Sequence, residues 1–111
     1  MNYNNKKFRP IKSSGNSALD NDTLFAYQQT GNILTCTYHG EDIKSGHLIG
    51  IVDENGSIDM RYHQVSKDGE LMTGICISTP EILSNGKIRL HEKWQWTSGD
   101  QSKGTSILEE I

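Results

Sequence analysis

The sequence lacks the features that would mark a membrane protein or a secreted, disulfide-rich protein. No apolar run approaches the ~20 residues that a membrane-spanning helix needs. The first residues, MNYNNKK, do not contain the apolar stretch of a signal peptide. Two cysteines are present, Cys36 and Cys76, and they form no CxxC pair. We therefore expect a cytoplasmic protein that contacts no membrane, with both thiols reduced and buried as small hydrophobes.

Basic residues and helical patterns are also scarce. The 111 residues include 11 Lys and Arg against 14 Asp and Glu, which gives a net charge of −3. Proteins that bind a phosphate backbone usually show a basic excess or a dense basic patch, so we expect no nucleic acid partner. No stretch of a dozen residues has apolar positions at helical spacing between capping residues. The chain length suits one domain.

The sequence has instead a recurring alternation of apolar and polar residues, interrupted by turn residues, which is typical of an antiparallel meander. The first twenty residues lack this pattern, so we predict a flexible N-terminal tail over 1–20 and a single domain over 21–111. A second interpretation stays open, in which Phe8 and Ile11 pin part of the tail as an edge strand. The predicted strands are 23–29, 32–39, 46–52, 57–65, 70–79, 86–96 and 104–110.

These predicted strands indicate an all-β fold, a single antiparallel meander of about seven strands. A meander with one apolar face can bury that face by rolling into an up-and-down barrel of the calycin or lipocalin kind, or into a half-barrel. We favour closure because it also removes exposed strand edges. Pro80 cannot donate to a strand ladder, so we expect a bend or an edge there.

The turns predict which residues share a face. Asn55-Gly56 and Asn85-Gly86 are strong two-residue hairpin signals, and Asp68-Gly69 is a weaker one. Two-residue turns at these places set the side-chain parity of the strands that they join. The predicted inner face contains Phe25, Tyr27, Leu34, Cys36, Tyr38, Ile49, Ile51, Met60, Tyr62, Leu71, Thr73, Ile75, Ile77, Ile88, Leu90, Glu92, Trp94 and Trp96. The predicted outer face contains Asp59, Arg61, His63, Lys87, Arg89, His91, Lys93 and Gln95.

Two segments, LIGIVDENGSIDMRYHQV and NGKIRLHEKWQWTSGDQSKGTSILEE, carry a family resemblance. Over roughly residues 23 to 111 the chain resembles small bacterial stand-alone proteins that are often labelled "N-acetylglutamate synthase". The resemblance implies a shared fold. Acetyl-CoA transferases of that type hold the pyrophosphate in a Gln/Arg-x-x-Gly-x-Gly/Ala loop that opens a helix. The chain contains no such loop, so we expect it not to bind acetyl-CoA.

The most unusual residue is Glu92, which stands on the predicted inner face between Leu90 and Trp94. A carboxylate in that position needs a partner or must take up a proton. It is either a ligand anchor or general base, or a structural group held by neighbouring donors. The predicted ligand-binding residues combine this carboxylate with aromatic and polar neighbours on the same face: Glu92, Trp94, Trp96, Tyr62, His47 and Thr73.

Three functions remain open at this stage. The favoured one is a non-catalytic barrel that binds a small apolar or aromatic ligand. The alternative is a structural or interaction protein with a filled core, which acts through its outer face or as a homodimer. A small enzyme that uses Glu92 and His47 is least favoured, because no serine has a convincing His/Asp set. The four histidines lack metal-ligand spacing, so we expect no metal and no other cofactor.

Overall fold

The alternating sequence forms strands throughout the computed structural model, which describes residues 1–14 and 22–111. The described residues contain no helix, and hence none that could cross a membrane. All seven predicted strands are present, the first of them as two short pieces, and one more precedes them. The strands are β1 (Lys7–Ser13), β2 (Phe25–Ala26), β3 (Gln28–Thr30), β4 (Ile33–Tyr38), β5 (Ile43–Val52), β6 (Ile58–Ser66), β7 (Leu71–Ile82), β8 (Ile88–Trp96) and β9 (Lys103–Glu110).

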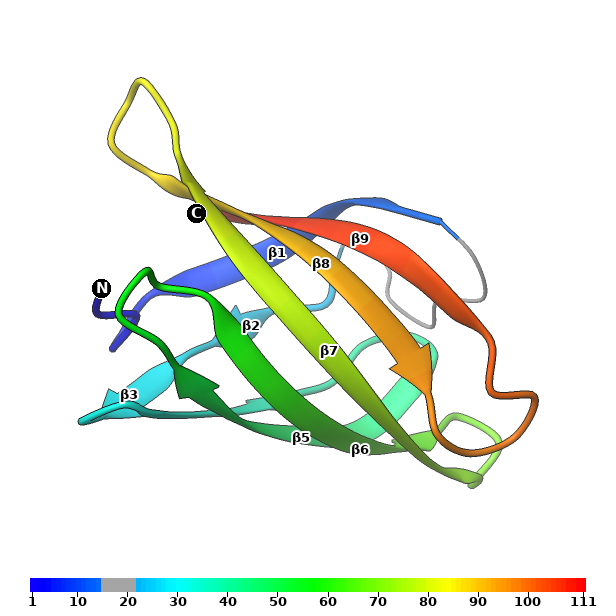
Figure 1. Cartoon of the computed structure of the whole chain (residues 1–111). Coiled ribbons are helices and arrows are strands. Elements are labelled where there is room, and N and C mark those ends of the chain that lie inside the picture. Colours follow the sequence, from blue (N-terminus) through cyan, green and yellow to red (C-terminus); the bar gives the residue numbers. More distant parts are fainter. Residues whose placement is uncertain (15–21) are drawn as a thin grey trace.

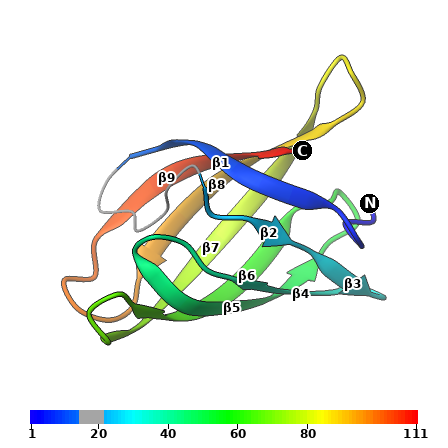
Figure 2. The same cartoon turned by 180° about the vertical axis from the view of Figure 1, so that it is seen from behind.

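The strands form one antiparallel sheet that curls into a nearly closed barrel (Figure 1). The order across the sheet is β2-β1-β9-β8-β7-β6-β5-β4-β3. Its two end strands, β2 and β3, are separated in the chain by Tyr27 alone. One short segment therefore pairs with β1 through its first part and with β4 through its second, as the view from behind shows (Figure 2). The predicted all-β meander barrel is confirmed.

Strand β1 lies within the predicted flexible tail over 1–20, so part of that tail is a strand, as the second interpretation expected. It pairs with β9 on one side and with β2 on the other, so it lies inside the sheet order and not at an edge. Phe8 and Tyr3 are fully buried, with ring centroids 6.2 Å apart, and they help to fill one end of the barrel. The alternation of buried and exposed residues in β1 is interrupted by a register shift after Pro10, so the sequence pattern does not indicate a strand there. The remainder of the predicted tail, 15–20, lies outside the described residues.

The hairpin turns contain one residue more than predicted. The amide of Asp53 donates to the carbonyl of Ser57, and the amide of Gly56 donates back to the carbonyl of Asp53. The loop between them therefore has three residues and ends in Gly56, whose φ of 84° favours glycine. The turns at 66–70 and 83–87 repeat the same two bonds and also place a positive-φ glycine third.

Each extra turn residue reverses the side-chain parity of the next strand relative to the prediction. The predicted face of β6 is confirmed, and one extra turn residue separates β6 from each of its neighbours, so the predicted faces of β5 and β7 are wrong. The extra residue in the turn after β7 reverses the parity again, so the predicted face of β8 is confirmed. Arg61, Arg89 and Lys93 do point outward. The residues that were predicted to be buried and instead point outward are Ile49, Ile51, Leu71, Thr73, Ile75 and Ile77. The inward positions on these two strands belong to Leu48, Gly50, Val52, Met72, Gly74, Cys76 and Ser78.

Pro80 lies where β7 has a neighbour on one side only. The ladder between β6 and β7 ends at the pair of Ile58 and Ser78, whereas the ladder between β7 and β8 continues past it. The hairpin that joins β7 to β8 consequently projects beyond the barrel (Figure 1). Such a one-sided position is the kind of edge at which a strand tolerates proline.

Candidate functional site

A buried carboxylate lies in the interior of the barrel. Glu92 projects inward from β8 and is 7% exposed. Its ladder partners are Ser78 on β7 and Ser106 on β9. The Ser78 hydroxyl donates to Glu92 Oε2 at 2.6 Å, and the Ser106 hydroxyl donates to Oε1 at 3.1 Å. The prediction that Glu92 is buried and hydrogen-bonded is thus confirmed, with serines from the two flanking strands as its donors.

The surroundings of Glu92 favour its neutral form. Burial raises the pKa of Glu92, and the two serine hydrogen bonds oppose that rise. Burial, followed by the charge of Glu92, likewise raises the pKa of Tyr27 and of Cys76. All eleven lysines and arginines fall in the described part of the chain, and none of them lines the space around Glu92. The carboxyl group therefore has neutral acids around it and no cation.

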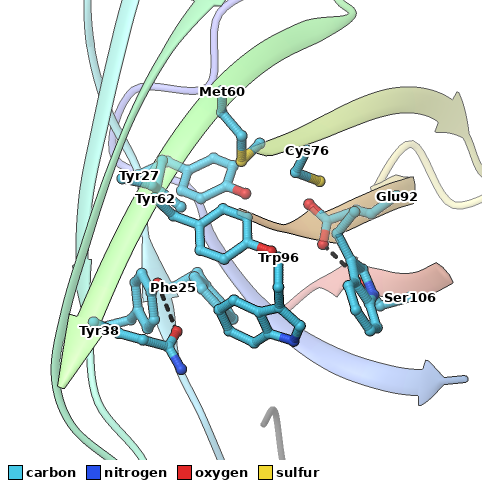
Figure 3. Close-up of a pocket in the computed structure, with 12 residues that line it drawn as sticks. Phe25, Tyr27, Tyr38, Met60, Tyr62, Cys76, Glu92, Trp96 and Ser106 are labelled. Carbon is cyan, nitrogen blue, oxygen red and sulfur yellow. Dashed lines mark hydrogen bonds between the residues drawn. The ribbon is translucent and has the colours of Figure 1, made fainter. Parts of the chain in front are cut away.

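A cavity of about 50 Å³, partly open to solvent, extends from Glu92 toward the end of the barrel at which β6 ends and β7 begins. Its wall is mainly aromatic (Figure 3). The rings of Tyr62 and Trp96 meet edge to face with centroids 5.3 Å apart, and the two tryptophans lie 6.1 Å apart. The lining residues are Phe25, Tyr27, Tyr38, Leu48, Met60, Tyr62, Gln64, Cys76, Glu92, Trp94, Trp96 and Ser106.

Three polar atoms of the cavity wall have no hydrogen-bond partner among the described residues. They are the Tyr27 hydroxyl, Gln64 Nε2 and Trp94 Nε1. The other amide atom of Gln64, Oε1, accepts a bond of 3.0 Å from the Tyr38 hydroxyl. A buried polar group without a partner typically costs about 1–3 kcal/mol. Three such groups around one cavity, together with a carboxyl group, give it the polar contacts that a bound molecule needs.

Sequence comparison assigns the chain to a family. The family of avidin-like proteins matches it over residues 1–111, which is the whole chain. The chain belongs to the avidin-like family. Members of this family have a calycin-type β-barrel, in agreement with the architecture described above. No curated protein and no solved structure matches the chain. These comparisons neither support nor contradict the label "N-acetylglutamate synthase".

Two glycines let the aromatic wall of this avidin-like barrel lie close to its strands. Gly74 faces the ring of Tyr62, and Gly46 faces the ring of Tyr38, in each case across the β-ladder. A Cβ atom at either glycine would lie 2.3 Å from the nearest ring atom. Only glycine therefore allows each tyrosine to pack flat over the neighbouring strand.

The avidin-like barrel brings together four of the six predicted site residues. Glu92, Trp94, Trp96 and Tyr62 all line the cavity. His47 and Thr73 do not, because the three-residue turns reverse the parity of β5 and β7.

On the outer face of the barrel, the ring of His47 lies 5.3 Å from that of His63. The Thr73 hydroxyl lies there too, and it shares a hydrogen bond of 2.8 Å with Thr97. Sequence reasoning placed Phe25, Tyr27 and Tyr38 on the inner face without assigning them to the site, and it missed Gln64, Ser78 and Ser106. Three-residue turns would have placed Ser78 inward beside Glu92.

Proposed function

We propose that this avidin-like protein is a non-catalytic module that binds a small ligand inside its barrel. The observation that carries the proposal is the cavity between Glu92 and Gln64, whose wall is aromatic and whose polar atoms lack partners among the described residues. Aromatic walls with a few convergent polar groups are typical of small-molecule sites. The avidin-like family binds small ligands such as biotin, which supports the same function.

The size of the cavity limits which part of the ligand is enclosed. An apolar cavity of about 150 Å³ binds benzene, and the space here is about 50 Å³. The cavity therefore encloses a polar head group, whereas the rest of the ligand lies against Trp96 and Tyr62 toward the open end. The head group offers acceptors to Trp94 Nε1 and Gln64 Nε2, and it meets the Glu92 carboxyl group.

The proposal is tested by calorimetry and by NMR with the full chain. Biotin is the first probe, followed by a library of small polar compounds that carry an aromatic ring. Gln64→Met keeps the length of the side chain and removes the free donor, so it should weaken binding of any compound that binds. Gln95→Met, on the outer face of β8, is the matched control and should bind as the native chain does. If no compound shifts the resonances of cavity residues, the proposed function is wrong.

We further propose that the outer face associates with a second copy of the chain. Five isoleucines on the outer face of β4, β5 and β7 are between 36% and 53% exposed. Strands β5 and β7 flank β6, and β4 lies beyond β5. On β6 the Asp59 carboxylate and the Arg61 guanidinium form a 2.7 Å ion pair. This isoleucine face consists of Ile33, Ile49, Ile51, Ile75 and Ile77.

The two charges make the isoleucine face complementary to itself. Around a two-fold axis, Asp59 of one copy can face Arg61 of the other while the isoleucines pack together. Exposed apolar patches of this kind commonly mark interaction sites. Avidin-like proteins often form oligomers, which favours a second copy as the occupant.

Sedimentation velocity tests the association. The native chain should sediment as a dimer, and the double variant Ile49→Lys with Ile77→Lys should sediment as a monomer. The matched control is Ile82→Lys, because Ile82 is 58% exposed and lies outside the isoleucine face. A native chain that stays monomeric across the micromolar range would refute this proposal and leave ligand binding untouched.

A further inference from the structure

The inference concerns the class of ligand, and it rests on the proposed function. Glu92 is a buried acid whose two carboxyl oxygens each accept one serine hydrogen bond. A carboxylate has about four lone-pair sites, so two further acceptor positions remain. The close-up view shows the carboxyl group of Glu92 among the side chains that line the pocket (Figure 3). A ligand group that reaches Glu92 inside the cavity therefore meets a hydrogen-bond acceptor.

No cation of the protein accompanies that acceptor. The titratable groups that surround the cavity with Glu92 are Tyr27, Tyr38, Tyr62 and Cys76. All are acids that are neutral around pH 7, and burial raises the pKa of each of them. Every lysine and arginine lies elsewhere, on exposed or half-buried positions. A buried carboxylate is stabilised when a cation pairs with it, and here only a ligand can supply one.

The aromatic wall suits the same kind of ligand. Six of the lining side chains carry aromatic rings, namely Phe25, Tyr27, Tyr38, Tyr62, Trp94 and Trp96. The negative face of an aromatic ring attracts ammonium groups, and aromatic cages recognise them in many proteins. The aromatic wall can therefore attract and stabilise a positively charged group that has been removed from bulk water.

We propose that the barrel selects a small organic ammonium compound, whose charged nitrogen donates to the Glu92 carboxylate inside the aromatic wall. An ether, hydroxyl or carbonyl oxygen on the same molecule accepts from Trp94 Nε1 or Gln64 Nε2. Burial raises the pKa of Glu92, so a proton competes with the ammonium group for this carboxylate. Where Glu92 carries that proton, binding of the ammonium ion releases it to the solvent, and the ligand keeps its own proton.

Three matched probes test the charge preference by calorimetry with the full chain. They are 2-phenoxyethylamine, 2-phenoxyethanol and phenoxyacetate, which share a ring and an ether oxygen and differ in charge. The native chain should bind the amine at least tenfold more tightly than the alcohol, and it should bind the acid most weakly. Measurements in two buffers of different ionisation enthalpy should show more proton release with the amine than with the alcohol, and more at low pH than at high pH.

A variant assigns the preference to the carboxylate. Glu92→Gln keeps the shape of the side chain and removes its charge, so it should lose the preference for the amine over the alcohol. Glu54→Gln, in the exposed 53–57 turn, is the matched control and should keep the preference. The comparison of probes on the native chain stands even if Glu92→Gln does not fold.

The outcomes separate this inference from the proposed function. Equal affinity for amine and alcohol, or a preference that survives in Glu92→Gln, overturns the inference and leaves ligand binding intact. Binding of biotin with no binding of the amine has the same meaning. If no probe binds and the compound library also gives no ligand, both proposals are wrong.

Discussion

The burial of Glu92 makes a specific prediction about stability and pH. Its pKa is raised in the folded chain, because burial outweighs the hydrogen bonds from Ser78 and Ser106. The folded state therefore holds the carboxyl proton more tightly than the unfolded chain does. The contribution of this group to stability is complete at low pH, where both states carry the proton. It is lost as the pH rises from the unfolded pKa through the folded one.

The variant Glu92→Gln removes this loss. It should match the native chain near pH 4 and become progressively more stable than the native chain as the pH rises. The difference in unfolding free energy should grow by at most about 1.4 kcal/mol per pH unit, which is the value for one proton. It should become constant once the pH exceeds the folded pKa. The amide of the variant can still bond both serines, since a hydroxyl accepts as well as donates.

Urea denaturation between pH 4 and pH 8, followed by tryptophan fluorescence, measures the difference. Glu54→Gln is the control, because Glu54 lies in the exposed 53–57 turn, and it should stay within about 0.5 kcal/mol of the native chain at every pH. A Glu92→Gln variant that is less stable than the native chain by a constant amount would refute the reasoning. It would mean that Glu92 is ionised throughout and that its serine bonds stabilise the charge.

Two further predictions concern packing, and a third concerns acetyl-CoA. Gly74→Ala should cost about 1–3 kcal/mol and change the near-UV circular dichroism, because the new Cβ displaces the ring of Tyr62; a native spectrum would contradict this. Leu90→Ala should cost about 2–5 kcal/mol in urea denaturation, whereas Ile75→Ala on the outer face should cost about 1 kcal/mol or less; equal losses would contradict the register. Acetyl-CoA should not bind, since the chain lacks the pyrophosphate loop, and saturable binding at micromolar concentration in calorimetry would contradict that expectation.

The fold could be predicted because its signals lie within single strands. Alternation along each strand gave the strand positions, and the glycine turns gave their antiparallel order. Strand β1 was only the second interpretation because Phe8 and Pro10 alone are buried in it, and its register shifts directly afterwards. The closure that β1 provides depends on pairing with β9, which is the last strand of the chain. No local pattern carries that long-range contact.

The residues of the candidate site likewise fall into those that could be predicted from a single strand and those that could not. Glu92, Trp94 and Trp96 could be found because they alternate along one strand, and their shared face needs no knowledge of the turns. Ser78 lies across a turn from Glu92, and a turn longer by one residue moves a whole strand to the other face.

The sequence Asn-Gly is compatible with both turn lengths, because glycine accepts positive φ in either. The loop length is decided by the bonds around it, such as the amide of Leu83 donating to the carbonyl of Lys87. The local sequence therefore identifies the carboxylate but not the hydroxyl groups that hold it. In the sequence Glu92 therefore has the appearance of an isolated buried charge, whereas in the structure it lies between two serines, one on each flanking strand.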